Sequence, residues 1–114
     1  MSSDATPQIS ATAAAGLLNG DAVMLDVREQ HEWDAGHAPQ ARHLPMSELA
    51  ARISEVPTDV AVICVCHLGG RSAAVSDALT RAGFNALNVS GGMAAWEAAG
   101  LPVVDDAGNP GAVI

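Results

Sequence analysis

The chain has 114 residues, enough for one domain with its own core, and its 49% apolar content argues against a disordered chain. Five Arg, no Lys and 13 acidic residues give a net charge of −8, which argues against nucleic acid or an anionic membrane surface as a partner. The longest apolar stretch, residues 60–66, is far shorter than the ~20 residues of a transmembrane helix, and residues 1–4 lack the features of a signal peptide. We therefore expect a cytoplasmic protein.

The N-terminal third predicts a helix, a strand and a second short helix. Residues 1–7 are small and polar, and we expect them to be disordered. Ser10 can cap a helix that runs to residue 18. A continuous apolar run over residues 22–27 has the length of a strand, and residues 29–34 predict a short helical segment.

The middle of the chain predicts a second and a third strand. Residues 41–44 are typical of a brief strand, and Ser47 is placed to cap a helix through residue 53. Residues 60–66 are apolar at every position, including three valines and one isoleucine. Because this strand shows no alternation, it is predicted to be buried on both faces, as in a parallel sheet.

The C-terminal third predicts two helices around a fourth strand. Residues 72–82 place apolar side chains along one helical face, residues 86–89 have strand character, and residues 93–99 predict a final helix. Strands alternating with helices predict an α/β fold, with a doubly wound central parallel sheet flanked by helices on both faces. Residues 8–104 would form this domain. Residues 105–114 are rich in turn formers and predict a loosely held, extended C-terminal tail, with docking of its apolar end on a groove as the alternative.

The stretch with the most chemical information follows the third predicted strand. Cys66 lies at the end of that strand and is followed by His67, Leu68, Gly69, Gly70, Arg71 and Ser72, where a helix is expected to begin near Arg71 or Ser72. The two glycines allow the loop to bring its backbone amides close to the sulfur. Amides and a helix N-terminus stabilise a thiolate, which is the form that a nucleophilic cysteine requires.

The spacing within this loop distinguishes two chemistries. Four residues separate Cys66 from Arg71, whereas five separate the cysteine from the arginine in loops that wrap a phosphate in cysteine-dependent phosphatases. A shorter loop should form a narrower ring of amides, which suits a single sulfur atom carried on the cysteine as a persulfide.

The loop resembles that of the rhodanese family of sulfurtransferases, Cys-x-x-Gly-x-Arg-Ser. The resemblance extends, in the family's order, to Asp26-Val27-Arg28, to Glu32-Trp33-Asp34-Ala35-Gly36-His37-Ala38-Pro39, to residues 41–45 and to Gly91-Gly92-Met93-Ala94-Ala95-Trp96. Ala38 and Gln40 depart from the family's usual Ile and Gly and affect local turn geometry only. The resemblance implies that Cys66 takes a sulfane sulfur from a donor such as thiosulfate and passes it to a thiol or to cyanide.

The other loop residues are expected to bind substrate, and residues on a neighbouring strand to support them. His67 and Leu68 make the loop only weakly cationic, which favours a bulkier thiol or a protein persulfide as donor. Arg71 would either brace the loop or bind an anion. Asp26 and Arg28 end a strand that should adjoin the active one, so they are candidates for supporting hydrogen bonds around the site, with a surface or salt-bridge role as the alternative for Arg28.

The remaining assignments concern Cys64, ligands and competing functions. Cys64 is expected to fill the core, with a role as a resolving thiol as the alternative. No metal site and no cofactor are implied, because the persulfide itself carries the chemistry.

Two alternative functions remain: a phosphatase or arsenate reductase, and a non-catalytic module for partner binding or redox sensing. Expected partners are a small sulfur donor, a thiol acceptor and a protein that accepts sulfur, with the chain a monomer or a dimer.

Overall fold

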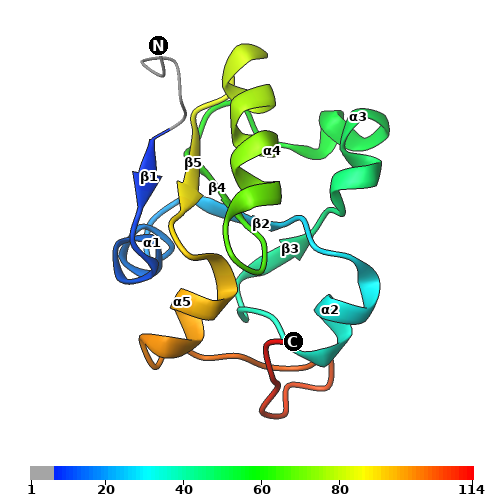
Figure 1. Cartoon of the computed structure of the whole chain (residues 1–114). Helices are drawn as coiled ribbons and strands as arrows, with labels where there is room; N and C mark the ends of the chain where they lie inside the picture. The colour runs from blue at the N-terminus through cyan, green and yellow to red at the C-terminus, as the bar shows by residue number, and fades with distance from the viewer. Residues whose placement is uncertain (1–6) are drawn as a thin grey trace.

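The computed structural model describes residues 7–114, in which a five-stranded sheet lies between helices on both of its faces (Figure 1). The strands are β1 (Gln8–Ile9), β2 (Val23–Asp26), β3 (Ala41–His43), β4 (Val62–Val65) and β5 (Ala86–Val89). The helices are α1 (Ala11–Leu17), α2 (Gln30–Ala35), α3 (Leu49–Arg52), α4 (Gly70–Arg81) and α5 (Gly92–Ala98), and two 3-10 turns, η1 (Met46–Glu48) and η2 (Ile53–Glu55), flank α3. All strand pairs are parallel, in the order β1-β5-β4-β2-β3. The predicted fold class is confirmed.

The central strand β4 is buried on both faces, as its unbroken apolar sequence predicted. Cys64 and Cys66 face a core cluster that includes Val75 and Leu79 of α4. Ile63 faces the opposite cluster, which contains residues of α1 and α5, among them the fully buried Trp96. Burial of a large apolar side chain contributes about 1.5–3 kcal/mol, so these two layers fix the position of β4 firmly.

The chain leaves β2 and β4 in opposite directions. After β2 it moves outward to β3 at one edge of the sheet, and after β4 it moves to β5 on the other side. Adjacent strands whose connections diverge in this way open a crevice at their carboxyl ends, where ligands bind in doubly wound sheets. Asp26 of β2 pairs in register with Val65 of β4, so Cys66 lies directly at this carboxyl edge of the sheet.

Two elements differ from the sequence-based expectation. Gln8 and Ile9 form a short edge strand on β5 that was not predicted. Of residues 1–7, which were expected to be disordered, Pro7 accepts a hydrogen bond from the Asn88 amide through its carbonyl. Residues 1–6 lie outside the described residues. The prediction of a single helix capped by Ser47 is wrong. The segment is divided into η1, α3 and η2, and the Ser47 side chain caps none of them. This segment buries little apolar surface, and a short helix without a buried face is marginal.

The tail is held against the domain by backbone hydrogen bonds. Val104 bridges to His37 on one side and to Pro110 on the other, and the Ala112 amide donates to the Ala35 carbonyl at 2.9 Å. Val113 packs against the core cluster of α1 and α5. The apolar end of the tail therefore docks on this chain, and the loose attachment expected from its turn residues is not observed. None of the described helices has the length and apolar character needed to cross a membrane.

Candidate active site

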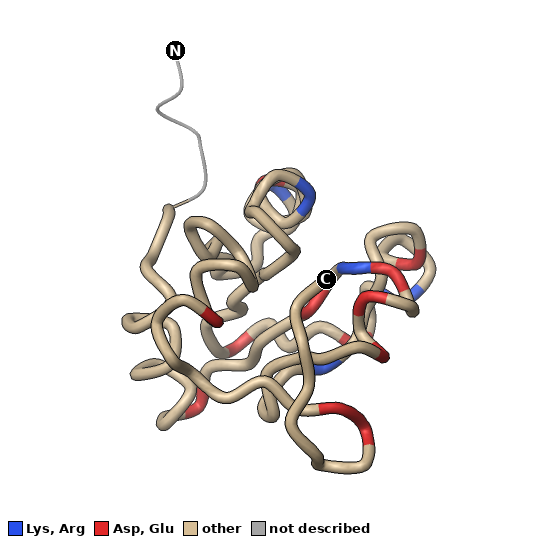
Figure 2. The backbone as a smooth tube through the Cα atoms, turned by 60° about the horizontal axis from the view of Figure 1, so that its bottom comes forward, with Lys and Arg blue, Asp and Glu red and all other residues tan. Residues whose placement is uncertain are grey.

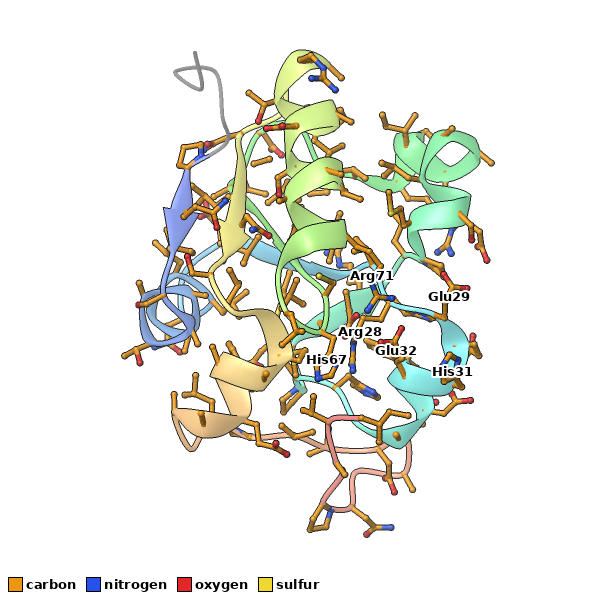
Figure 3. All side chains as sticks on the ribbon, in the orientation of Figure 1. Arg28, Glu29, His31, Glu32, His67 and Arg71 are labelled. Atoms are coloured by element: carbon orange, nitrogen blue, oxygen red, sulfur yellow. The ribbon has the colours of Figure 1, made fainter. Side chains whose placement is uncertain are left out.

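Cys66 lies at the carboxyl edge of the sheet, between the end of β4 and the first turn of α4. Its side chain is only 1% exposed. The labelled side chains of Arg28, Glu32, His67 and Arg71 gather at this end of the molecule (Figure 3). The structure thus brings together the loop predicted to carry the chemistry and the end of the neighbouring strand β2.

The loop after Cys66 turns its polar groups toward the sulfur. The Gly69 amide donates a hydrogen bond to Cys66 Sγ at 3.1 Å, and the Ser72 hydroxyl donates to the same sulfur at 3.3 Å. Gly69 adopts a φ of 110°, a left-handed conformation that a residue with a Cβ rarely adopts. α4 begins at Gly70, one or two residues earlier than predicted, so its N-terminus directly adjoins the sulfur.

These donors control the ionisation of Cys66. Burial by itself raises the pKa of a thiol, because the charged form loses its hydration. Hydrogen bonds from the Ser72 hydroxyl and from the amides of Ser72, Gly69 and Arg71 oppose this effect and leave the pKa of Cys66 below its ordinary value. The site therefore favours a thiolate, the reactive form of cysteine.

The N-terminus of α5 supports the loop from the opposite side. The Met93 amide donates to the Cys66 carbonyl at 2.7 Å, and the Ala94 amide donates to the His67 carbonyl at 3.0 Å. Gly92 has a φ of 58°, and a Cβ at this position would overlap the Cys66 carbonyl oxygen. The close approach of α5 thus requires glycine. The carbonyls of Cys66 and His67 are therefore both bonded by backbone amides of α5.

Arg71 braces the site through an ion pair. Its Nη1 lies 2.7 Å from Glu32 Oε1 and its Nη2 lies 2.9 Å from Glu32 Oε2. This pairing holds the pKa of Glu32 at about 2, with the Arg71 hydrogen bonds as the largest cause. Of the two roles considered for Arg71, bracing is the one for which the structure provides a partner.

Arg28 and Asp26 form a buried pair beneath the loop. Arg28 is fully buried, and its Nε and Nη2 donate to the Asp26 carboxylate at 2.8–3.1 Å. Arg28 Nη2 also donates to the Gly36 carbonyl at 2.7 Å, which ties β2 to the end of α2. The alternative of a surface position for Arg28 is wrong, since the side chain has no exposure. Neither side chain has a hydrogen bond to Cys66 among the contacts of the described residues.

Three loop residues are more exposed than Cys66. His67 is half-buried, Gly70 is exposed, and Leu68 is 68% exposed. None of the hydrogen bonds described for Cys66 Sγ comes from these three residues. Their role in binding substrate remains a prediction from the sequence.

Cys64 lies two residues before Cys66 in the same core cluster but in a different environment. It is fully buried and free of any disulfide, and burial raises the pKa of its thiol to about 11. It therefore remains a neutral thiol at physiological pH, in keeping with a core residue. Within residues 7–114, no group of three His, Cys, Asp or Glu side chains is arranged to hold a metal ion.

Sequence reasoning missed two residues that support the loop. Glu32 was noted only as part of a family segment, although it holds Arg71. Asn88 Nδ2 donates to the Gly69 carbonyl at 3.2 Å from strand β5. The available signal was polarity: Asn88 is a polar residue inside an apolar strand, and such a residue is buried only where it has partners.

The position of α2, which carries Glu32, depends on the C-terminal segment. Trp33 of α2 is half-buried and stacks on His37 with ring centroids 3.5 Å apart. Its Nε1 donates to Asp106 Oδ1 at 3.1 Å. The segment after α5 therefore holds the helix that positions Glu32.

Comparison with known proteins gives a consistent result at the level of sequence. Residues 10–99 match a family model described as a rhodanese-like domain. The chain is also 38% identical over 85 residues to a protein named sulfurtransferase from Allochromatium vinosum, an alignment that covers 74% of this chain and 79% of that protein.

Solved structures resemble the fold closely. A rhodanese-related protein from Thermoplasma volcanium superposes with a TM-score of 0.81 at 32% identity, covering 86% of this chain and 97% of that one. A thiosulfate sulfurtransferase from Pseudomonas aeruginosa gives a TM-score of 0.79 at 27% identity and covers 96% of this chain. Only 22% of that larger protein is covered, so this chain corresponds to one part of it.

Proposed function

The chain belongs to the rhodanese family, and on that premise we propose that it is a sulfurtransferase whose Cys66 carries the transferred sulfur as a persulfide. One observation carries the proposal: Cys66 Sγ accepts hydrogen bonds from Gly69 and Ser72 at the N-terminus of α4. These donors stabilise negative charge on the sulfur before the reaction, and on a second sulfur bonded to it afterwards.

The first step loads the cysteine. The Cys66 thiolate attacks the outer sulfur of a donor such as thiosulfate and forms a new S–S bond. The S–S bond of thiosulfate breaks, and sulfite leaves with the bonding electron pair. The product is a Cys66 persulfide anion, and no external oxidant or reductant is needed.

The second step unloads it. An acceptor thiolate or cyanide attacks the terminal sulfur of the persulfide, and the S–S bond to Cys66 breaks. The acceptor becomes a persulfide or thiocyanate, and Cys66 returns to its thiolate form. A low thiol pKa assists this step as well, because a stabilised thiolate is a better leaving group.

Phosphatase chemistry receives less support from the same residues. A phosphate-binding loop uses the fork of its arginine to bind two phosphate oxygens. Here both Nη atoms of Arg71 already bind the carboxylate oxygens of Glu32. Together with the short spacing from Cys66 to Arg71, this favours sulfur transfer over phosphoryl transfer.

The test is intact mass spectrometry after brief incubation with thiosulfate. We expect wild-type protein and Cys64→Ala to gain the mass of one sulfur atom and to lose it on addition of cyanide, while Cys66→Ala gains nothing. If Cys66→Ala gains sulfur and Cys64→Ala does not, the persulfide forms on Cys64 and the assignment of the chemistry to Cys66 is wrong. No gain in wild-type protein, with thiosulfate or with an organic persulfide, would leave the non-catalytic module as the better description.

A further inference from the structure

Two consecutive glycines in the reactive loop flank a peptide group that can turn over. Turning the plane between Gly69 and Gly70 by about 180° changes only ψ of the first residue and φ of the second. Gly69 has a φ of 110° and a ψ of −10°, so the turned peptide would give it a positive φ with an extended ψ, which glycine alone adopts. Gly70 would leave its helical conformation for a positive φ, which is also open to glycine. The orientation of this peptide is therefore left to its neighbours.

The orientation matters because the two ends of a peptide have opposite polarity. The Gly69 carbonyl accepts the first hydrogen bond of α4, from the Ala73 amide at 3.0 Å. The Gly70 N–H belongs to the same peptide and points the opposite way, out of the N-terminus of the helix. The next amide, that of Arg71, points in this direction and hydrogen-bonds Cys66. A turned peptide would present a carbonyl oxygen to this space, where an anionic sulfur needs a donor.

Asn88 of β5 holds the carbonyl end of this peptide. Its Nδ2 donates to the Gly69 carbonyl at 3.2 Å and to Gln8 Oε1 at 2.9 Å. Because a carbonyl can only accept, the nitrogen of the Asn88 amide must face Gly69 and the oxygen must face away. The bond from Ala73 is the terminal one of a helix, where fraying begins, so Asn88 supplies the contact that does not depend on the helix end.

Stability alone does not account for an asparagine at this position. The Asn88 side chain is 2% exposed, and its Oδ1 is buried without a hydrogen-bond partner among the described residues. A buried oxygen without a partner lowers stability, and an apolar residue of similar size would avoid this on a strand whose other residues are Ala, Leu and Val. The contact with the Gly69 carbonyl gives the residue a role that an apolar side chain lacks.

The segments that carry Asn88 and its partner Gln8 contain no charged residues. Residues 7–20 and 82–96 have no Asp, Glu, Lys or Arg, and their backbone is tan in Figure 2. The charged pair next to the loop, Arg71 with Glu32, belongs to α4 and α2. A neutral substitution of Asn88 therefore changes hydrogen bonding at the loop without changing a charge.

We propose that Asn88 is a positioning residue for Cys66. Its amide holds the peptide between Gly69 and Gly70 with the N–H directed to the side of the sulfur. Its role in sulfur transfer rests on the function proposed above and assigns a further residue to the same site. In the persulfide, the outer sulfur lies one bond beyond Cys66 Sγ, and the Gly70 N–H stabilises its charge. Without Asn88, the peptide turns over in part of the molecules, which then present an oxygen to the anion.

The experiment follows Cys66 by two readouts in a Cys64→Ala background. The pH profile of alkylation by iodoacetamide reports the thiolate, and the rate at which thiosulfate adds one sulfur, measured by intact mass, reports the proposed reaction. The principal variant is Asn88→Leu, which removes the donor and keeps a core residue of similar size. Gln8→Ala is a milder second variant, because Gln8 is exposed and anchors the Asn88 amide from the edge strand. Urea denaturation establishes that each variant is folded.

We expect Asn88→Leu to shift the alkylation profile upward by about 0.5 pH unit, the effect of a reversed dipole near the thiolate. Loading should slow roughly tenfold, because the outer sulfur loses a hydrogen bond to its charge. Gln8→Ala should move both readouts in the same direction by less. Ser76→Ala is the matched control and should move neither, since this buried serine of α4 donates to the Leu87 carbonyl of β5 and not to the loop.

A second substitution separates the orientation of the peptide from general damage to the loop. Gly70→Ala suits the helical conformation, because a Cβ there would meet no atom within 4 Å. It disfavours the positive φ that the turned peptide needs, so in the Gly70→Ala background Asn88→Leu should slow loading only about twofold. Any effect of Gly70→Ala by itself cancels in this comparison.

Two results would overturn the inference. If folded Asn88→Leu moves neither readout, Asn88 does not position Cys66. If Asn88→Leu slows loading equally with and without Gly70→Ala, the peptide between the glycines is not the element that Asn88 holds. Should Asn88→Leu fail to fold, Gln8→Ala decides by the same criteria.

Failure of the proposed function is distinguishable from these results. If no persulfide forms on wild-type protein with thiosulfate or an organic persulfide, the sulfurtransferase function fails. The alkylation profile does not depend on sulfur transfer, so it then decides alone whether Asn88 acts on Cys66.

Discussion

Arg71 and Glu32 form a two-point ion pair that connects the first turn of α4 to α2 across 39 residues of sequence. The Glu32 side chain is 11% exposed and that of Arg71 is 37% exposed. The pair is therefore partly shielded from water, and it joins the reactive loop to α2. Because one arginine nitrogen meets each carboxylate oxygen, the geometry of the pair is fixed as well as its charge.

Removing this carboxylate should destabilise the protein. Glu32→Ala leaves Arg71 without its partner in a half-buried position, and we expect the free energy of unfolding to fall by about 1–2 kcal/mol after allowance for the exposure of Arg71. Urea denaturation measures the change. Glu55→Ala serves as the control with a smaller effect, because the Glu55 side chain is 56% exposed and Arg52 keeps Glu48 as a second partner. Equal losses in the two variants would contradict a special contribution from Glu32.

The same pair makes stability depend on pH in the acid range. The pKa of Glu32 in the folded protein is about 2, below the value near 4.3 expected in the unfolded chain. A depressed pKa means that the stabilisation is complete above the unfolded value and is lost as the pH falls toward 2. The free energy of unfolding should therefore fall less steeply between pH 5 and pH 2 in Glu32→Gln than in wild-type protein. Parallel pH profiles would show that Glu32 is not the group responsible.

The reactivity of Cys66 should depend on Ser72. In a Cys64→Ala background, Ser72→Ala removes the hydroxyl that donates to the sulfur, so the pKa of Cys66 should rise. The rate of alkylation by iodoacetamide reports the thiolate, and its pH profile should shift to higher pH. Ser76→Ala is the matched control, because this buried serine of the same helix donates to the Leu87 carbonyl instead. An unshifted profile in Ser72→Ala would mean that the loop amides alone set the pKa.

Local features of the sequence were sufficient to predict four of the five strands and to single out Cys66 as the candidate nucleophile. β4 could be recognised because every residue is apolar, and Cys66 because a glycine-bearing loop and a helix follow it. β1 could not, because two residues cannot display a pattern. The pairing of Glu32 with Arg71 was also out of reach, since it depends on where the fold places α2 relative to the start of α4, which no spacing in the sequence encodes. The attachment of the tail depends likewise on long-range contacts, such as the one between Trp33 and Asp106.

The contact between α5 and the reactive loop provides the sharpest test of the architecture. Gly92 has a φ of 58°, and a Cβ there would overlap the Cys66 carbonyl, whereas Gly100 has a φ of 75° with open space around it. Both substitutions by alanine incur backbone strain of about 1–2 kcal/mol, but only Gly92→Ala also forces α5 away from the loop. We therefore expect Gly92→Ala to lower the free energy of unfolding more than Gly100→Ala, and to slow persulfide formation on Cys66 in the fraction that remains folded. If the two variants lose the same stability and load sulfur at the same rate, the hydrogen bonds from α5 to the loop do not position the nucleophile.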